Sequence, residues 1–300
     1  MIAPLRRALE RRRLRSRRRQ ASEQRHADLH RLALSDRSIG IGNTEPQEIV
    51  VSLTSYDRRI PFTYLCVESL LRQSLKPDRL VLWLSRKDFP DEKLPDPLLN
   101  QVERGLEIIF HDEDLGPYKK VIYALEQCPD SLLITVDDDT LYPPDLVESL
   151  YRAYLARPDT IHCHRGHRLR TDSTGRPLSY AEWGLGQGGH SPSPLVFPTG
   201  VGGVLYFPGA LHPEVLNREQ FMRLCPRADD IWLKAMSLMQ GVPCAVVPDE
   251  THWKDRFLTI PGSQGESLKR ENWDRRLGND SKIAAVFEAY DLFHCVNGKS

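Results

Sequence analysis

The sequence of 300 residues lacks several features that mark common protein classes. No apolar run approaches the roughly 20 residues of a membrane span, and the N-terminus has no hydrophobic signal core. Six cysteines lie far apart without a CxxC pair, which predicts free thiols, a reducing compartment and hence a cytoplasmic protein. The motifs GxGxxG and GxxxxGK[ST] are absent, so neither a dinucleotide-binding fold nor a P-loop kinase is supported.

Charge is present in balance but is unevenly distributed. The formal net charge is zero, yet residues 1–37 hold twelve arginines against four acidic residues, a net of +8, so the rest of the chain carries −8. Good helix formers dominate this segment, and we expect residues 1–46 to be a basic helical or disordered appendage. A basic helix of this kind suits an anionic membrane at its inner face or an acidic partner protein, and a solvated tail is the alternative. Nucleic acid is not expected, because the acidic body shows no matching basic and aromatic pattern.

The body of the chain, residues 47–295, shows an alternation of apolar runs and amphipathic segments. The pattern predicts, in order, a strand at 49–53, a helix at 61–73, strands at 79–85 and 106–110, a helix at 119–128 and a strand at 132–136. This order implies an α/β fold of the Rossmann-like kind, with a mostly parallel sheet flanked by helices.

The most informative stretch is SLLITVDDDTLY at residues 131–142. An apolar, β-rich run ends abruptly in Asp137, Asp138 and Asp139. Ligands of open α/β sheets bind beyond the carboxyl ends of the strands. Three adjacent carboxylates repel one another, and a hard divalent cation with oxygen ligands is the simplest compensation. A solvated acidic turn that caps the next helix is the alternative.

These segments together resemble a known family. VVSLTSYDRRI, SLLRQSLKPDRLVLWLS, GPYKKVIYAL and ITVDDDTLYP are similar to the nucleotide-sugar-binding half of GT-A-fold glycosyltransferases. The resemblance covers about residues 48–260 and is closest to the family-2-like enzymes that build bacterial surface polysaccharides. It implies that Asp137 and Asp139 form a DxD motif, which carries Mn²⁺ or Mg²⁺ and contacts the sugar nucleotide. Asp138 would lie beside them on the donor side.

The second half of the resemblance concerns an acidic pair. PTGVGGVLYFPGAL at 198–211 is similar to a glycine-rich acceptor wall, and RADDIWLKAMSLMQGVP at 227–243 places Asp229 and Asp230 at a helix start. In inverting members the second acid of such a pair is the general base, which implies that role for Asp230 with Asp229 holding the geometry. A carboxylate is chemically suited to deprotonate an attacking hydroxyl. Helix capping is the alternative for both residues.

Further residues are predicted for each side of the site. The donor would contact Thr54, Ser55, Tyr56, Arg59 and either Lys119 or Lys120, and His252 would add a metal ligand. The acceptor side would include Arg165, His167, Tyr180, Trp183, Gly202 and Gly203, although the two aromatic residues are equally expected in the core. A lid over the diphosphate would use Lys269, Arg270 and Trp273, but the family's QxxRW sequence is absent. The implied subdivision is a nucleotide-sugar half at 47–145, an acceptor half at 146–260, and a lid and helix at 261–295.

The resemblance therefore implies a metal-dependent glycosyltransferase that inverts the configuration of the anomeric carbon and acts in bacterial surface glycan synthesis, of capsule or lipopolysaccharide. Its partners would be a nucleotide-sugar donor and a glycan or lipid-linked acceptor. Two alternatives stay open at this point. One is a nucleotidyltransferase or other phosphate-transfer enzyme, which should show a glycine-rich basic loop after the first strand. The other is a non-catalytic scaffold that binds nucleotide sugars.

Overall fold

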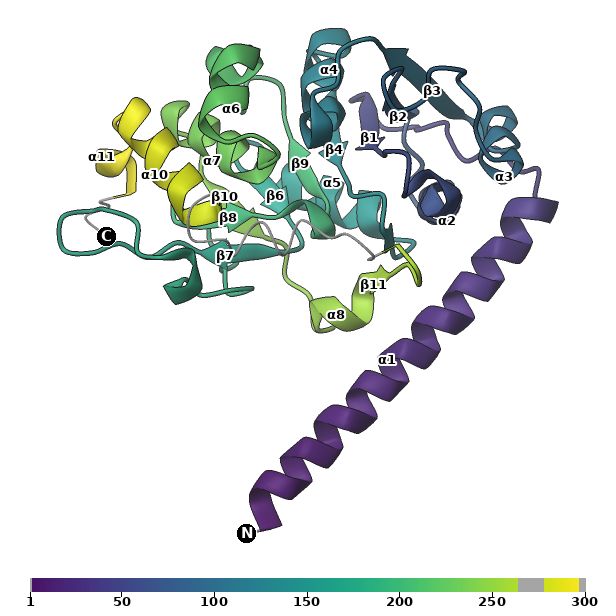
Figure 1. The fold of residues 1–300 in the computed structure, drawn as a ribbon, viewed down its shortest axis with the longest axis horizontal. Coiled ribbons are helices and arrows are strands. Elements are labelled where there is room, and N and C mark those ends of the chain that lie inside the picture. The colour runs from purple at the N-terminus through teal and green to yellow at the C-terminus, as the bar shows by residue number, and fades with distance from the viewer. Residues whose placement is uncertain (1, 264–277, 297–300) are drawn as a thin grey trace.

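A seven-stranded sheet forms the centre of the molecule, whose computed structural model describes residues 2–263 and 278–296 (Figure 1). The strand order is β10-β6-β9-β4-β1-β2-β3. Its strands are β1 (Ile49–Thr54), β2 (Arg79–Ser85), β3 (Leu106–His111), β4 (Leu132–Thr135), β6 (Ile161–Cys163), β9 (Val204–Tyr206) and β10 (Cys244–Val246). Two short antiparallel pairs lie beside it, β5 (Thr140–Leu141) with β11 (Leu258–Thr259) and β7 (Gly166–Arg168) with β8 (Val196–Pro198).

The pairing of the strands is mostly parallel, which confirms the predicted fold class. β1 pairs in parallel with β2 and β4, and only β9 runs antiparallel to its two neighbours in this sheet as described. The sheet continues across residue 145, because β4 pairs with both β1 and β9. The predicted division of the body into two halves and a lid stays a prediction.

Helices cover both faces of the sheet (Figure 1). They are α1 (Ile2–Ser35), α2 (Ile60–Leu70), α3 (Asp96–Leu99), α4 (Lys119–Gln127), α5 (Leu146–Ala156), α6 (Arg218–Leu224), α7 (Asp229–Met239), α8 (Trp253–Arg256), α10 (Asn279–Ala289) and α11 (Phe293–Val296). Buried side chains of α4, α7 and α10 share one core with one face of the sheet. Those of α1, α2 and α5 share a second core with the other face. Alternate residues of β1 enter the two cores, Val50 the first and Val51 the second, as expected for a strand buried on both faces.

The cysteines and the long helices bear on two features that the sequence lacks, paired cysteines and a membrane span. All six cysteines are free, as predicted. Within residues 2–263 and 278–296, no helix combines the length and the apolar character needed to cross a membrane. The cytoplasmic location inferred from the cysteines stays a prediction.

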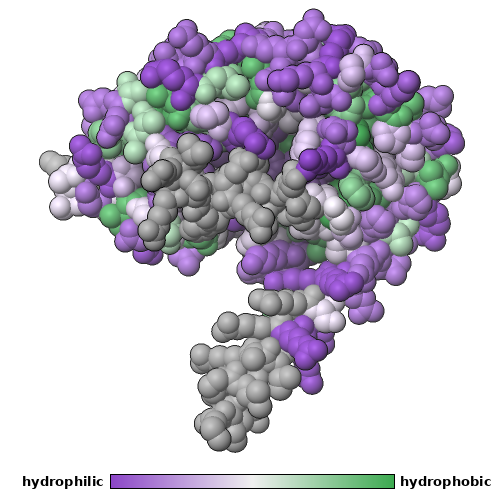
Figure 2. Space-filling model, in the orientation of Figure 1, coloured by the Kyte–Doolittle hydropathy of each residue, from purple (hydrophilic) through white to green (hydrophobic). Residues whose placement is uncertain are grey.

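The basic N-terminal segment is a long helix, α1, that projects from the body toward its N-terminus (Figure 1). Its C-terminal part packs on α2 through the buried side chains Leu29 and Ala33. Farther toward the N-terminus, the Ser22 hydroxyl donates to the Thr259 carbonyl at 2.7 Å, and Arg18 bonds both carboxylate oxygens of Asp255 at 2.6 and 2.9 Å. Where its side chains are described, the projecting helix is hydrophilic (Figure 2). The segment is therefore a docked helix and not a disordered tail.

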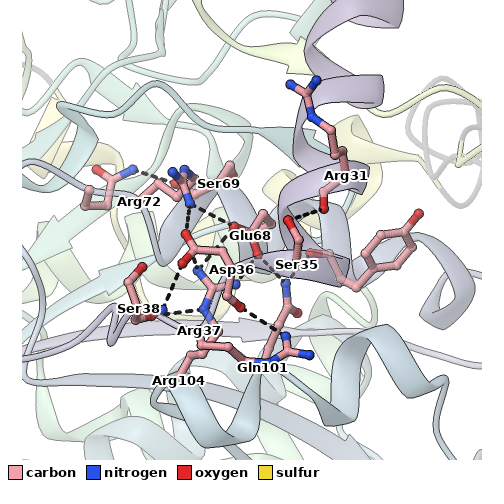
Figure 3. Close-up of polar contacts among 12 residues, drawn as sticks. Arg31, Ser35, Asp36, Arg37, Ser38, Glu68, Ser69, Arg72, Gln101 and Arg104 are labelled. Atoms are coloured by element: carbon pink, nitrogen blue, oxygen red, sulfur yellow. Dashed lines mark hydrogen bonds and ion pairs between the residues drawn. The ribbon is translucent and has the colours of Figure 1, made fainter.

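A buried ion-pair network holds the end of α1 against the body (Figure 3). Glu68 of α2 is fully buried, and Arg104 donates to its two carboxylate oxygens at 2.6 and 3.2 Å. Asp36, the residue after α1, pairs with Arg72, which lies just beyond the end of α2, and is 3.6 Å from Arg104. Gln101 also donates to Glu68 at 3.1 Å. Three separate segments of the chain thus meet around one buried carboxylate.

Candidate active site at the carboxyl end of β4

The three consecutive aspartates lie beyond the carboxyl end of β4, as predicted. β4 ends at Thr135, and the Val136 amide still donates to the Ser52 carbonyl of β1 at 3.0 Å. Asp138 is buried, with 5 % of its side chain exposed, whereas 30 % of Asp137 and 13 % of Asp139 remain accessible. The outer two carboxylates therefore face the space beyond the sheet, and the middle one points into the protein.

Asp138 is fixed by groups of the first strand and its loop. Its carboxylate accepts from the Ser55 hydroxyl at 2.6 Å and from Arg59 Nη1 at 2.7 Å. Burial raises the pKa of Asp138 to about 6, although the Arg59 charge opposes this shift. Arg59 also pairs with Asp139 at 3.0 Å and lies 5.6 Å from the ring centre of Tyr56. Asp138 thus anchors the loop after β1, and its contact with a donor stays a prediction.

The other residues predicted for the donor side divide into two groups. Tyr56 and Arg59 are half-buried and stand beside the aspartates, at the carboxyl end of β1. By contrast, the hydroxyl of Thr54 donates to the Trp83 carbonyl at 2.8 Å, and Lys119 is buried in an ion pair with Asp114 at 2.6 Å. These two side chains are engaged in local bonds, and their contact with a donor stays a prediction.

Lys120 connects the aspartate triplet to the predicted acidic pair. Its ammonium group is buried, 2.7 Å from Asp137 Oδ1 and 3.1 Å from Asp229 Oδ2. Burial opposes the charge of Lys120, but Asp137, Asp229 and Asp230 outweigh it and hold its pKa well above the ordinary value. The structure therefore brings together, around one cation, carboxylates that lie far apart in the sequence.

Asp229 and Asp230 begin α7, and neither one caps it. The N-cap residue is Ala228, which makes no side-chain cap bond, so the carboxylates occupy the first turn, where the helix dipole favours negative charge. Asp229 is buried against Lys120, whereas Asp230 is half-buried and accepts from the Gly200 amide at 3.2 Å. The adjoining cavity of about 10 Å³ holds a water molecule at most.

The protonation of Asp230 is strongly shifted. Desolvation is the largest cause and the negative charge of Asp229 the second, and together they raise the pKa of Asp230 to about 8. Lys120 and the Gly200 amide act in the opposite direction, and Asp137 adds to the rise. A carboxyl with a pKa near the working pH is suited to accept a proton from a hydroxyl and release it again.

Gly200 separates the two groups of carboxylates, a role that the sequence did not reveal. A Cβ atom at this position would lie 2.7 Å from Asp137 Oδ1 and 3.1 Å from Lys120 Nζ. Only a residue without a side chain allows the backbone to approach both Asp137 and Asp230. The glycine-rich stretch at 198–211 was the available signal, but it did not distinguish Gly200 from Gly202 and Gly203.

The residues predicted for the acceptor side also separate into two groups. The charge of Asp230 raises the pKa of both Arg165 and Tyr180, which indicates that these two residues lie near Asp230. His167 and Trp183 are buried and bonded within their own segment, His167 Nδ1 accepting from Gly186 and Trp183 Nε1 donating to Leu178. A Cβ on Gly202 would lie 2.8 Å from the Arg165 amide nitrogen, and Gly203 has a φ of 75°. Their roles toward an acceptor stay predictions.

A metal ion would find oxygen ligands at Asp137 and Asp139, which suit Mg²⁺ or Mn²⁺. The described part of the chain contains no cluster of three or more His, Cys, Asp or Glu side chains that would hold a metal by itself. His252 is the N-cap of α8, where its Nδ1 accepts from the Lys254 amide at 3.2 Å, and its role as a ligand stays a prediction. The donor set still fits, because Mg²⁺ usually takes one or two carboxylates and completes its shell with phosphates and water.

The predicted lid residues Lys269, Arg270 and Trp273 lie outside the described residues. Trp253, the neighbour of His252, was not among the predicted site residues, but it contacts Arg165. Its ring centre lies 4.5 Å from the guanidinium carbon of Arg165.

Comparison with known proteins gives a family and two distant structures. Residues 51–193 match the family model described as Glycosyl transferase family 2. No curated protein matches the chain significantly. S. aureus TarS (residues 1–349, in complex with UDP) shares 14% identity at a TM-score of 0.43, over 68% of this chain and 59% of that chain. The mannosyltransferase PcManGT from Pyrobaculum calidifontis, in complex with GDP-Man and Mn²⁺, shares 14% identity at a TM-score of 0.39, over 79% and 65%. The chain thus spans less than two thirds of either neighbour.

Proposed function

Since this chain is a glycosyltransferase of the GT-A, family-2-like type, we propose that it transfers a sugar from a nucleotide-sugar donor to a hydroxyl acceptor with inversion at the anomeric carbon. The observation that carries the proposal is the meeting of Asp137, Asp229 and Asp230 around Lys120 at the carboxyl end of β4. The donor would lie across the ends of β1 and β4. The family match favours this reading over a nucleotidyltransferase or a non-catalytic scaffold.

The proposed mechanism assigns a different task to each carboxylate. Asp230 accepts the proton of the acceptor hydroxyl while the hydroxyl oxygen forms a bond to the anomeric carbon. The bond between that carbon and the diphosphate oxygen breaks, and its electron pair leaves with the nucleoside diphosphate. Asp229 and Lys120 hold the geometry, since the buried ion pair at 3.1 Å fixes the start of α7 against α4.

Asp137 and Asp139 are the residues that would hold a divalent ion, which would supply positive charge to the leaving diphosphate. Each already faces a side-chain cation, Asp137 at Lys120 and Asp139 at Arg59. When a donor binds, these two cations would share in neutralising its phosphates. The proposal therefore includes dependence on Mn²⁺ or Mg²⁺ for full activity.

We further propose that the enzyme acts in bacterial surface glycan synthesis, near an anionic membrane surface. The support is the sequence resemblance together with α1, a helix rich in arginine that projects from the acidic body (Figure 1). A cytoplasmic enzyme with a lipid-linked acceptor would gain from such a peripheral contact.

The test is sugar transfer and donor hydrolysis by the full chain across a panel of nucleotide sugars, with Mn²⁺, with Mg²⁺ and with excess chelator. UDP- and GDP-sugars should be included, as the two structural neighbours were solved with UDP and GDP-Man. We expect turnover with at least one donor and loss of turnover in chelator. Asp139→Asn should abolish metal-dependent donor binding, whereas Asp57→Asn, an exposed aspartate of the loop after β1, should not. Full turnover in chelator would show that the metal proposal is wrong.

A further inference from the structure

Arg165 is a half-buried cation without an ion-pair partner in the part of the chain that the structure describes. Its Nη1 donates to the Thr199 hydroxyl at 2.8 Å, and its guanidinium stacks on Trp253 at 4.5 Å. Its Nε is buried and has no hydrogen-bond partner. Arginine stays charged at any working pH, and a desolvated charge without a partner is costly. Burial accordingly lowers the pKa of Arg165.

The position of Arg165 places this unmatched charge on the acceptor side of the site. It lies in the turn between β6 and β7, on the half of the sheet beyond β4 and away from β1, β2 and β3. Among the groups that act on its charge are Tyr180, Asp230 and Asp137, none of them close enough for an ion pair. The predicted base therefore faces a guanidinium that it does not neutralise.

The cations of the donor side differ from Arg165 in this respect. Arg59 pairs with Asp138 and Asp139, and Lys120 pairs with Asp137 and Asp229. Their charges are matched before any ligand binds. Arg165 instead donates to Thr199 alone among the hydrogen bonds of the described side chains, and its buried Nε has no partner. Its guanidinium thus keeps hydrogen-bonding capacity that suits the oxygen atoms of a carboxylate or phosphate.

We propose that Arg165, held by Thr199 and Trp253, binds an anionic group carried by the acceptor, a carboxylate or a phosphate close to the hydroxyl that attacks the donor. The inference rests on the proposed function, because it takes Asp230 as the base and the space around it as the acceptor site. It narrows the acceptor to molecules that carry a carboxylate or a phosphate near the attacking hydroxyl. Stacking on Trp253 keeps the guanidinium planar and oriented, so little of its conformational freedom is lost on binding.

A guanidinium could also bind the diphosphate of the donor, so the experiment must distinguish an anionic group of the acceptor from that diphosphate. The full chain is titrated with glucose, glucuronate and glucose 6-phosphate by calorimetry while UDP or GDP with Mn²⁺ saturates the donor site. We expect the two anionic sugars to bind the wild-type chain about tenfold or more tightly than glucose. Arg165→Gln should remove this preference and leave the affinity for the nucleoside diphosphate unchanged.

Two further variants separate charge from packing. Arg165→Lys keeps the charge and should retain part of the preference, whereas a purely structural role would make it as deficient as Arg165→Gln. Arg168→Gln is the matched control, because Arg168 lies on the adjoining β7 and bonds Ser193 at 3.2 Å. Equal binding of neutral and anionic sugars by the wild-type chain would overturn the proposal. So would a loss of nucleoside diphosphate affinity in Arg165→Gln, which would assign the guanidinium to the donor. Nucleoside diphosphate binding by the wild-type chain tests the proposed function separately.

Discussion

The carboxyl group of Asp230 has a pKa of about 8 because it is desolvated and because Asp229 lies beside it. A general base works only in its deprotonated form. Below pH 8 most Asp230 carboxyls hold a proton, so kcat/KM should rise about tenfold per pH unit from pH 6 to 7 and level off above pH 8 to 9. The measurement is the pH profile of sugar transfer at saturating metal. A flat profile between pH 6 and 9 would contradict the assignment.

The charged and titratable groups around Asp230 provide the control for this pH profile. They are Asp229, Lys120, Asp137, Arg165, Tyr180 and Tyr206. Asp229→Asn removes the negative charge that raises the pKa of Asp230, and Lys120 then no longer shares its charge with Asp229. The pKa of Asp230 should therefore fall, and the rising limb of the pH profile should move to lower pH. Asp230→Asn should lower turnover by about 10² or more and abolish the limb while nucleoside diphosphate binding is largely kept.

Gly200 is the second residue whose effect can be predicted individually. In Gly200→Ala the new methyl group must displace the Asp137 carboxylate, because it would lie 2.7 Å from Oδ1. The displaced group is the end of a side chain, so we expect only a small loss of thermal stability. Misplacement of a site group by about 1 Å costs on the order of 10²-fold in rate. Steady-state kinetics and a melting curve together test this, and near wild-type turnover would mean that the position of Asp137 is not critical.

At the scale of elements, buried strands were the part of the fold that the sequence predicted best. The run at residues 79–85 matches β2 completely, because Pro77 and Asp78 mark its start and every residue after Arg79 is buried. The helix at 61–73 was predicted too long, because α2 ends at Leu70. Beyond this end, the side-chain amide of Gln73 donates to the carbonyls of Ser69 and Pro143. The pattern of apolar residues predicts which segments are buried, whereas the end of a helix depends on individual side-chain hydrogen bonds of this kind.

The network at the end of α1 shows what pattern alone does not reveal, and it gives a stability prediction. Glu68→Gln would remove the buried carboxylate that bonds Arg104 and leave this arginine only the longer contact with Asp36, so we expect a loss of about 3 kcal/mol in the free energy of unfolding (Figure 3). Glu23→Gln is the matched control on α1, because it breaks an exposed pair with Arg19, and exposed pairs contribute little to stability. Denaturant unfolding measures both variants. Equal small losses would show that the buried network does not stabilise the docking of α1.

At the scale of the whole molecule, the sequence located the aspartate triplet and the acidic pair but not how they meet. The strand pattern placed Asp137 at the carboxyl end of a strand, and the resemblance implied that Asp230, at a helix start, is the general base. The bridge through Lys120 depends on contacts of α4 and the end of β4 with α7, which lies far from both in the chain. Likewise, nothing in the sequence distinguished Arg165 as unpaired, because pairing depends on which carboxylates the fold brings within reach.

The structure also changes how the proposed membrane contact of α1 should be tested. Removing residues 1–37 would expose the α2 surface under Leu29 and Ala33 and break the Asp36 network, so deletion of residues 2–17 is the sharper variant. It removes seven arginines, and each arginine near an anionic surface contributes about 1 kcal/mol. We expect the deletion to release the protein from anionic vesicles in 0.15 M salt without changing donor hydrolysis, since the predicted site residues all lie after residue 50. Replacing the same arginines by glutamine keeps the helix and should act alike. Neutral vesicles serve as the control, and equal co-sedimentation of full-length and shortened protein would leave α1 as a solvated helix without a membrane role.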